Sequence, residues 1–482
     1  MSRIQSSIPF LALLGVAVAP GVAKSDVPSL FAEAQLPTPS QADLACGVMP
    51  ECPGFADPTS DSIDDYRWER ADGRLFFLIT SAAALEDLAW RFQDEDQGGE
   101  IAGATFVLTT DLDASELDLA GGIGSPLVPF SGDFRGMGCE ISGASVYTND
   151  DWSDFDHEDR GTGLFGVVDG GLRRSDAQIH DLRVVDAWVL GGDSPTGAVV
   201  GNLRTGVVTN VDVESSADRV FLGTPSELAT TRVSGFSDVG GLVGTADDAI
   251  LRRVQFHGYH RSFDVTDAAH ASRDGGLIGV ATSTQVETAV VRTLMRSGFA
   301  GSHVGGLIGA SQNVLLKGVV VAGDNSSGGR FIYAHQWGDG GRSPLLGRVD
   351  GYAYLQDVVI GNRLRNTLAG ADVGFVAGQL GAGARLVDGE SQYGLGAGVA
   401  THGGACQACD DVQGAQVEGE SGFFSIDHPI YTSINAACEE PMLVPHVEST
   451  SVSLELVVLP DGSVDILLEP AAATATYPRL EL

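Results

Sequence analysis

Positive charge is scarce in this sequence, and lysine is almost absent. The chain of 482 residues has 28 lysines and arginines against 64 acidic residues, for a formal net charge of −36. Lys24 and Lys317 are its only lysines. So acidic a surface repels a phosphate backbone, which argues against nucleic acid as a partner. We expect most of the acids to form a solvated coat.

Long apolar runs are also lacking. The run Ile8–Ala19 is too short to span a membrane as a helix. It follows the basic Arg3 and precedes the small residues Gly21-Val22-Ala23, which is the order of a signal peptide. We therefore expect cleavage after Ala23 and no transmembrane segment in the mature chain. The protein should be exported, either secreted or held at a bacterial cell surface, with the periplasm as an alternative.

Recognisable catalytic motifs are missing as well. A metallopeptidase needs His-Glu-x-x-His to place two imidazoles on one helix face, and His157-Glu158 lacks the second histidine. Asn210-x-Asp212, Asp247-Asp248 and His257-Gly258 occur in the order of pieces of polygalacturonase-like sites, but with the wrong spacings. Ordinary surface and corner residues are the favoured interpretation, and Asn210 and Asp212 also fit a repeat strand, so no catalytic residue is predicted.

Cysteine is sparse, and its six copies suit an exported chain with disulfides. The short spacing favours a bridge between Cys46 and Cys52. A second bridge is expected from Cys438 to either Cys406 or Cys409, and Cys139 has no obvious partner. His402 beside the last three cysteines has the ligand types of a zinc site, but disulfides are the preferred interpretation.

Two further groups of residues have a functional and an ordinary interpretation. The acidic insertion 147–161 contains candidates for a weak calcium site, although it lacks the order and glycine of an EF-hand; the candidates are Asp150, Asp151, Asp154 and Asp156. No other cofactor is expected, and a solvated loop is the default. Trp188 and Trp337 are either exposed sugar-stacking aromatics or core and corner residues, and the second interpretation is favoured.

Glycine, by contrast, is abundant, with 64 copies spread through the chain. A marker of a small residue, two apolar residues and a glycine recurs down the middle of the sequence. We expect its final glycine to lie at a repeat corner, where positive φ or close backbone approach favours glycine. These corner candidates are Gly166, Gly201, Gly244, Gly279, Gly309 and Gly347.

The distance from each marker to the next strand is nearly constant. Anchor valines follow ten residues after three of the glycines (Val211, Val254 and Val319) and eleven after two others (Val290 and Val358). Apolar residues usually stand four before and two after the anchor, although Arg292 breaks this pattern. Fixed frames separated by variable segments are typical of stacked repeats, and alternation in steps of two is typical of strands.

These patterns predict an all-β chain whose main part is a right-handed parallel β-helix, or solenoid. A strand at 75–79 and a helix from Thr80 or Ser81 to Trp90 or Phe92, ended by Gly98-Gly99, should cap its first turn. Pro460-Asp461-Gly462 predicts a C-terminal hairpin. The expected segments are a signal peptide (1–23), an acidic leader (24–72), the capping strand and helix (73–100), the β-helix (101–395), a cysteine-containing cap (396–440) and the hairpin with its tail (441–482).

At its markers the chain resembles the GLUG-motif proteins, named for Gly-Leu-any-Gly. The resemblance extends to Phe130-Ser131-Gly132-Asp133-Phe134, whereas Arg135 to Cys139 depart from the family pattern. It implies an exported, cell-surface protein and no specific activity.

We therefore expect a non-enzymatic scaffold that recognises an extracellular glycan or a surface protein. The alternative is a polysaccharide-degrading lyase or hydrolase. Three or more carboxylates grouped with Arg or His in one groove on one sheet face would favour that enzyme.

Overall fold

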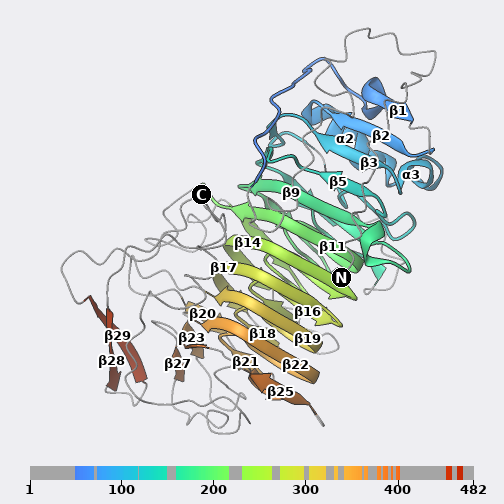
Figure 1. The fold of residues 1–482 in the computed structure, drawn as a ribbon. Coiled ribbons are helices and arrows are strands. Elements are labelled where there is room, and N and C mark those ends of the chain that lie inside the picture. The colour runs from blue at the N-terminus through green and yellow to red at the C-terminus, as the bar shows by residue number, and fades with distance from the viewer. Residues whose placement is uncertain are drawn as a thin grey trace, which may run out of the picture.

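The computed structural model describes residues 49–69, 73–117, 119–148, 159–216, 231–262, 272–297, 303–321, 331–334, 341–360, 363–366, 377–381, 384–388, 392–393, 398–401, 452–458 and 464–470. They form a mostly β protein with few helices and one large, mostly parallel sheet of 24 strands. The strands stack in chain order along an elongated body, from blue at one end to orange at the other (Figure 1). This class agrees with the predicted all-β chain.

The N-terminal end carries the helices (Figure 1). The 3-10 helix η2 (Ile63–Tyr66) and strand β1 (Arg67–Glu69) come first. Strand β2 (Leu75–Ile79) follows, at the residues where the sequence predicts a strand, so that prediction is confirmed. Helix α2 (Ala82–Arg91) begins as predicted, because the Ser81 hydroxyl accepts a hydrogen bond from the Ala84 amide. Its Leu85 and Leu88 are buried in the core.

The prediction that Gly98-Gly99 ends this helix is wrong. Asp94 caps a second helix, α3 (Glu95–Ile101), by accepting hydrogen bonds from the amides of Asp96 and Gln97. Gly98 lies inside α3 because a Cβ there would stand 2.9 Å from the Arg91 carbonyl oxygen. The glycine is present for close packing of two helices, not for a stop.

The remaining strands follow in repeating groups. The first groups are β3 (Thr105–Leu108) and β4 (Leu112–Asp113); β5 (Asp133–Arg135), β6 (Glu140–Ser142) and β7 (Ser145–Tyr147); and β8 (Phe165–Asp169), the 3-10 helix η5 (Arg174–Asp176), β9 (Gln178–Val185) and β10 (Trp188–Leu190). The middle groups are β11 (Val200–Glu214) and β12 (Arg232–Gly235); β13 (Val243–Asp247) and β14 (Ala249–Ser262); and β15 (Arg273–Gly275), β16 (Ile278–Thr282) and β17 (Gln285–Ser297). The last groups are β18 (His303–Gly305), β19 (Ile308–Val321) and β20 (Phe331–Ala334); β21 (Arg342–Ser343), β22 (Leu346–Ile360) and β23 (Arg363–Asn366); and β24 (Ala377–Leu380), β25 (Arg385–Asp388), β26 (Gln392–Tyr393) and β27 (Gly398–Thr401).

Equivalent residues of successive groups pair in parallel. The marker residue before the final glycine forms one continuous row, Phe165, Val200, Val243, Ile278, Ile308 and Leu346. Neighbouring members of such a row lie about 4.8 Å apart across the hydrogen bonds. The sequence markers therefore mark structurally equivalent positions.

A second row marks a bend in five successive groups of the described residues. Asp181, Asn210, Arg253 and Thr288 have φ of 56°, 56°, 50° and 54°, and Gly318 continues the row at 62°. The strand pairs on either side of these residues align them with one another. A left-handed residue interrupts the strict alternation of a strand, so the residues just before and just after it can both face the core.

This bend corrects the predicted frame. The residues that align with Val211, Val254 and Val319 include Ala289, not Val290. The anchor thus stands ten residues after Gly279 as well, and the core residue two beyond it is Val291, so Arg292 does not break the pattern. Val290 lies on the opposite side of the strand.

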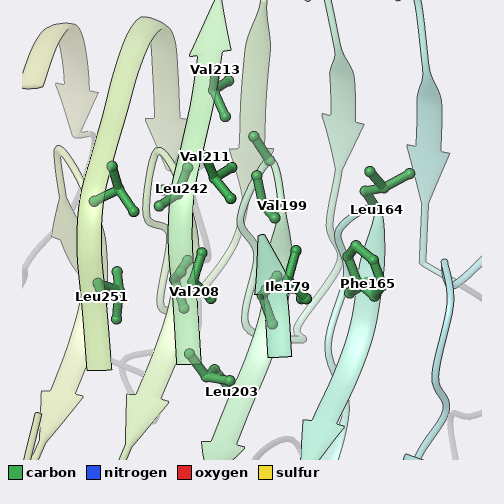
Figure 2. Close-up of a cluster of buried hydrophobic side chains, with 14 of the residues drawn as sticks. Leu164, Phe165, Ile179, Val199, Leu203, Val208, Val211, Val213, Leu242 and Leu251 are labelled. Carbon is green, nitrogen blue, oxygen red and sulfur yellow. The ribbon is translucent and has the colours of Figure 1, made fainter. Parts of the chain in front are cut away.

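The predicted core position four residues before the anchor is also shifted by one. The core contains the residues three before it, which form the row Val208, Leu251, Val286, Leu316 and Leu355. Figure 2 shows Val208, Val211 and Val213 pointing inward together toward Leu242 and Val199 from the opposite wall. The left-handed residue between Val208 and Val211 explains a step of three where alternation predicts two.

The marker glycines lie inside strands and outside the left-handed region, so they are not the bends themselves. They allow close approach instead. A Cβ on Gly244 would stand 2.3 Å from the Thr196 amide nitrogen, and one on Gly279 would stand 2.6 Å from the Asp238 carbonyl carbon. Gly166, Gly201, Gly309 and Gly347 would bring a Cβ equally close to neighbouring backbone. Only glycine fits there, because real Cβ atoms do not approach backbone so closely.

Near the C-terminus, β28 (Val452–Val458) pairs antiparallel with β29 (Val464–Pro470), and Val458 lies opposite Val464. The predicted C-terminal hairpin is therefore confirmed for its two strands.

Candidate functional site

Two outward sheet faces contain the chemically notable side chains. The acidic face is the outward side of 140–142, 182–185, 211–214 and 254–257. The aromatic face is the outward side of β7, β10, β12 and residues 259–261 of β14. The two faces belong to the same groups of strands and are separated in the early ones by the left-handed residues Gly143 and Asp186.

The acidic face is built by strand alternation just after the bend. Val211 and Val213 face the core, so Asp212 and Glu214 face outward side by side. Parallel pairing sets Arg183 on one flank of Asp212 and Gln255 on the other. Glu140 lies one strand further, opposite Arg183. Three carboxylates and an arginine therefore share this face, with Arg292 also close enough to lower the pKa of Glu214.

Asp212 is the least accessible of these groups. Its side chain is buried, and neither carboxyl oxygen accepts a hydrogen bond of normal geometry. Burial raises the pKa of Asp212 well above its usual value, and the charge of Glu214 raises it further. Burial also raises the pKa of Glu214, while Arg183 opposes that shift from 3.7 Å. Glu214 also accepts a hydrogen bond from the Gln255 amide at 3.3 Å.

The pair can therefore hold one proton between two unequal carboxyl groups. Asp212 keeps its proton to higher pH because it is fully buried, whereas Glu214 retains 15% side-chain exposure and an arginine partner. One protonated acid next to one ionised base is the arrangement that acid–base catalysis uses. Access is the obstacle to catalysis here, because Asp212 itself is only 1% exposed.

A third polar group lies at the bend beside the acidic face. The His180 ring bonds Asp133 through Nε2 at 2.9 Å and Asp181 through Nδ1 at 2.7 Å. The two carboxylates raise the pKa of His180 to about 9 in spite of its burial. The Asn210 amide donates to Asp181 at 2.6 Å, which explains why an asparagine occupies this bend. The group links strands β5, β9 and β11 through its side chains and so holds neighbouring strands together.

The aromatic face differs in its exposure. Trp188 and Leu190 alternate with the buried Val189 and are 52% and 40% exposed. Tyr147 lies opposite Leu190 on the neighbouring strand and is 42% exposed. Trp188 is therefore neither a core nor a corner residue, and the favoured interpretation of its sequence context is wrong. Nothing in its local sequence distinguishes it from a buried strand tryptophan.

Arginine completes the aromatic face. Arg232 pairs with Trp188 on one side and Tyr259 on the other. Its guanidinium lies 6.0 Å from the centre of the Tyr259 ring, within the range of a cation–π contact. Arg261 stands two residues further along β14, in the row of Tyr147, Leu190 and Ser234. This surface combines flat apolar rings with fixed positive charge.

The cysteines give one clear correction. Cys52 is bonded to Cys139, with a Cα–Cα distance of 4.6 Å, and not to Cys46 as predicted. Parallel stacking brings residue 139 to the N-terminal segment across a separation of 87 residues, which short-range spacing could not indicate. Cys46, Cys406, Cys409, Cys438 and the zinc candidate His402 lie outside the described residues.

Metal candidates are few in the part of the chain that the structure describes. There, the one group with suitable ligand spacing is Cys52, Asp111 and Cys139, and its two sulfurs are joined as a disulfide. The calcium candidates Asp150, Asp151, Asp154 and Asp156 lie outside the described residues, as does Trp337.

The pieces of the polygalacturonase-like pattern do not come together. Asp212 and His257 lie on the acidic face, where His257 follows Phe256, the partner of Val213. Asp248 occupies a different bend, with φ of 45°, and forms an ion pair with Arg174 of η5. Glu214, Arg183 and Glu140 are the acidic-face residues that sequence reasoning missed, because only the parallel register aligns them.

No protein-family model matches this chain, and no curated protein matches its sequence. Among the helices of the described residues, none is long and apolar enough to cross a membrane.

Proposed function

We propose that this chain is an exported, non-enzymatic scaffold of the GLUG-motif type, folded as a right-handed parallel β-helix over about residues 101–395. Rows of equivalent residues in parallel register support the solenoid. Its role is adhesion, through recognition of an extracellular glycan or a surface protein. The signal-like N-terminal sequence supports export, to the medium or to the cell surface, with the periplasm as an alternative.

The observation that carries the recognition role is the exposure of Trp188, Tyr147 and Leu190 together on one sheet face. Full burial of such large side chains contributes roughly 1.5–3 kcal/mol each, so burying their exposed parts against a partner would supply about half of that energy. Aromatic rings also dominate binding hot spots, because they offer large rigid areas.

Immobilised polysaccharides and intact cells provide the test. Wild-type protein should bind one of them, and Trp188→Ala should lose at least about tenfold in affinity. Trp90→Ala is the matched control, because Trp90 is 56% exposed but lies on helix α2. Equal affinity of wild type and Trp188→Ala for every surface bound would contradict this placement of the recognition surface.

Polysaccharide cleavage is the second candidate, favoured by the unequal carboxyl pair Asp212 and Glu214 with Arg183 beside it. Incubation with uronate polymers should then release reducing ends or unsaturated products, and Glu214→Gln should abolish the release. We rank this role below recognition because the burial of Asp212 closes it to a polymer chain. Product formation that depends on Glu214 would reverse the ranking.

A further inference from the structure

We propose that the aromatic face binds an anionic polysaccharide, with sugar rings on Trp188 and Tyr147 and the anionic groups on Arg232 and Arg261. This inference rests on the proposed recognition role and specifies its ligand. The argument begins with the two outward rows of the face, which the strand pairing defines.

The first row contains Ser145, Trp188, Arg232 and Tyr259, and the second contains Tyr147, Leu190, Ser234 and Arg261. Between them runs a buried row of Val146, Val189, Val233 and His260, so the two named rows lie on the side away from the core. The exposed rings of Tyr147 and Trp188 therefore lie on β7 and β10, and the arginines Arg232 and Arg261 lie on the next two strands, β12 and β14.

Two arginines with described side chains lie on adjacent strands of this face, Arg232 on β12 and Arg261 on β14. Only 28 lysines and arginines occur in the whole chain, against 64 acids. The two arginines therefore place positive charge beside the aromatic rings in an otherwise acidic protein. Neighbouring strands lie about 4.8 Å apart, so one polymer chain that crosses the face can reach both arginines.

Arg232 is the arginine best placed to meet a ligand. Several other surface arginines are ion-paired, including Arg174 with Asp248, Arg204 with Asp159 and Arg252 with Glu287. Among the residues that the structure describes, no carboxylate forms an ion pair with Arg232. Its guanidinium contacts the Tyr259 ring instead. A guanidinium offers two parallel N–H donors to a carboxylate or a sulfate, and it stands next to Trp188 on the adjacent strand.

The rings supply the second half of the recognition. The face of an indole or phenol ring carries negative quadrupole charge and attracts the weakly positive C–H face of a sugar ring. Ser145, which is half-buried and lies next to Trp188 on the adjacent strand, adds a hydroxyl to the first row. Single-stranded nucleic acid would use the same two features. The net charge of −36 and the expected export favour a polysaccharide.

Two pairs of polymers that differ only in charge provide the test. Polygalacturonate is compared with its methyl ester for carboxylates, and dextran sulfate with dextran for sulfates. Wild-type protein should bind one charged polymer at least about tenfold more tightly than its uncharged counterpart, the equivalent of one or two charge-assisted hydrogen bonds. Arg232→Gln should remove this preference, and Trp188→Ala should weaken binding to both members of the pair.

Arg252→Gln is the matched control and should behave as wild type, because Arg252 is an exposed arginine on another face, 2.7 Å from Glu287. Thermal melting of every variant separates lost binding from lost folding. Equal affinity for charged and uncharged polymers would overturn the anionic ligand while leaving glycan recognition intact. Tighter binding of oligothymidylate than of every polysaccharide would identify nucleic acid instead. Binding to cells but to none of these polymers would also overturn the inference.

Discussion

The acidic and aromatic faces belong to the same groups of strands, yet their side chains differ in exposure to water. On the acidic face, Asp212 is buried, and Glu214 is held by Gln255 and Arg183. On the aromatic face, Trp188 is half-exposed. One face uses its polar groups internally, whereas the other leaves large apolar groups in water.

We propose that this difference separates structural support from recognition. A buried, coupled carboxyl pair costs stability unless its neighbours compensate for it, so it has to be held by the surrounding strands. An exposed tryptophan contributes little to folding and can be changed without loss of the fold. The predictions below test whether stability and binding divide between the faces in this way.

The largest effect should come from a change that damages both faces together. Gly244→Val places side-chain atoms where the Thr196 amide already lies 2.3 Å from a Cβ, and should cost about 3 kcal/mol or more of unfolding free energy. Denaturant unfolding measures it. Gly99→Ala is the control, because a Cβ on Gly99 meets nothing within 4 Å. Unfolding of Gly244→Val at the wild-type midpoint would show that the stack tolerates wider spacing there.

Two histidines should give opposite pH dependences of stability. Burial lowers the pKa of His260, in the core row beneath the aromatic face, to about 3. The unfolded chain protonates near pH 6.5, so stability is lost as pH falls from about 6.5 toward 3. His260→Val should remove part of this acid sensitivity.

His180, at the bend beside the acidic face, has its pKa raised to about 9. Its stabilisation is fully present below about pH 6.5 and is lost as pH rises through about 9. His180→Gln should therefore cost on the order of 2–3 kcal/mol at pH 6 and much less at pH 10. Unfolding curves across this range test both variants, and identical pH profiles for the two would contradict the assignment.

A smaller effect is expected at the carboxyl pair. Because the pKa of Asp212 is raised, the native state loses stability relative to the unfolded chain as pH rises above about 4. Asp212→Asn should therefore stabilise the protein at pH 7, on the order of 1 kcal/mol, and have little effect near pH 4. Polysaccharide binding should not change. Destabilisation at pH 7 would mean that the ionised carboxylate is needed by its neighbours.

The smallest effect on folding should come from the aromatic face. Trp188→Ala is expected to change unfolding free energy by less than about 0.5 kcal/mol, since the side chain is half-exposed. Its melting temperature should match that of Trp90→Ala. A loss of several degrees would show that the ring is part of the structural framework after all.

Much of the fold can be predicted from the sequence, because the marker glycines and the strand frame recur where backbones pack closely. The strand Leu75–Ile79, the Ser81 cap and the C-terminal hairpin follow from local chemistry alone. The left-handed residue of the five described groups could not be predicted, because Asp, Asn, Arg, Thr and Gly occupy it in turn. Without that bend, alternation assigns Val290 to the core in place of Ala289.

The candidate sites were less predictable, because they depend on register between distant strands. Asp212 was visible in the sequence, but its neighbours Arg183 and Gln255 lie 29 and 43 residues away in number and one strand away in space. The same holds for Trp188 and Arg232, and for Cys52 and Cys139. Once the repeat register is known, these groupings follow from it.

Oxidative footprinting with and without a bound polysaccharide tests most directly whether the aromatic face is the recognition surface. Hydroxyl radicals modify exposed aromatic side chains, and mass spectrometry reads all of them in one sample. Polymer binding should protect Trp188 and Tyr147 and leave Trp90 and Tyr352, which are equally exposed elsewhere, unchanged. Protection at Trp90 or Tyr352 with Trp188 still fully reactive would contradict the assignment of recognition to the aromatic face.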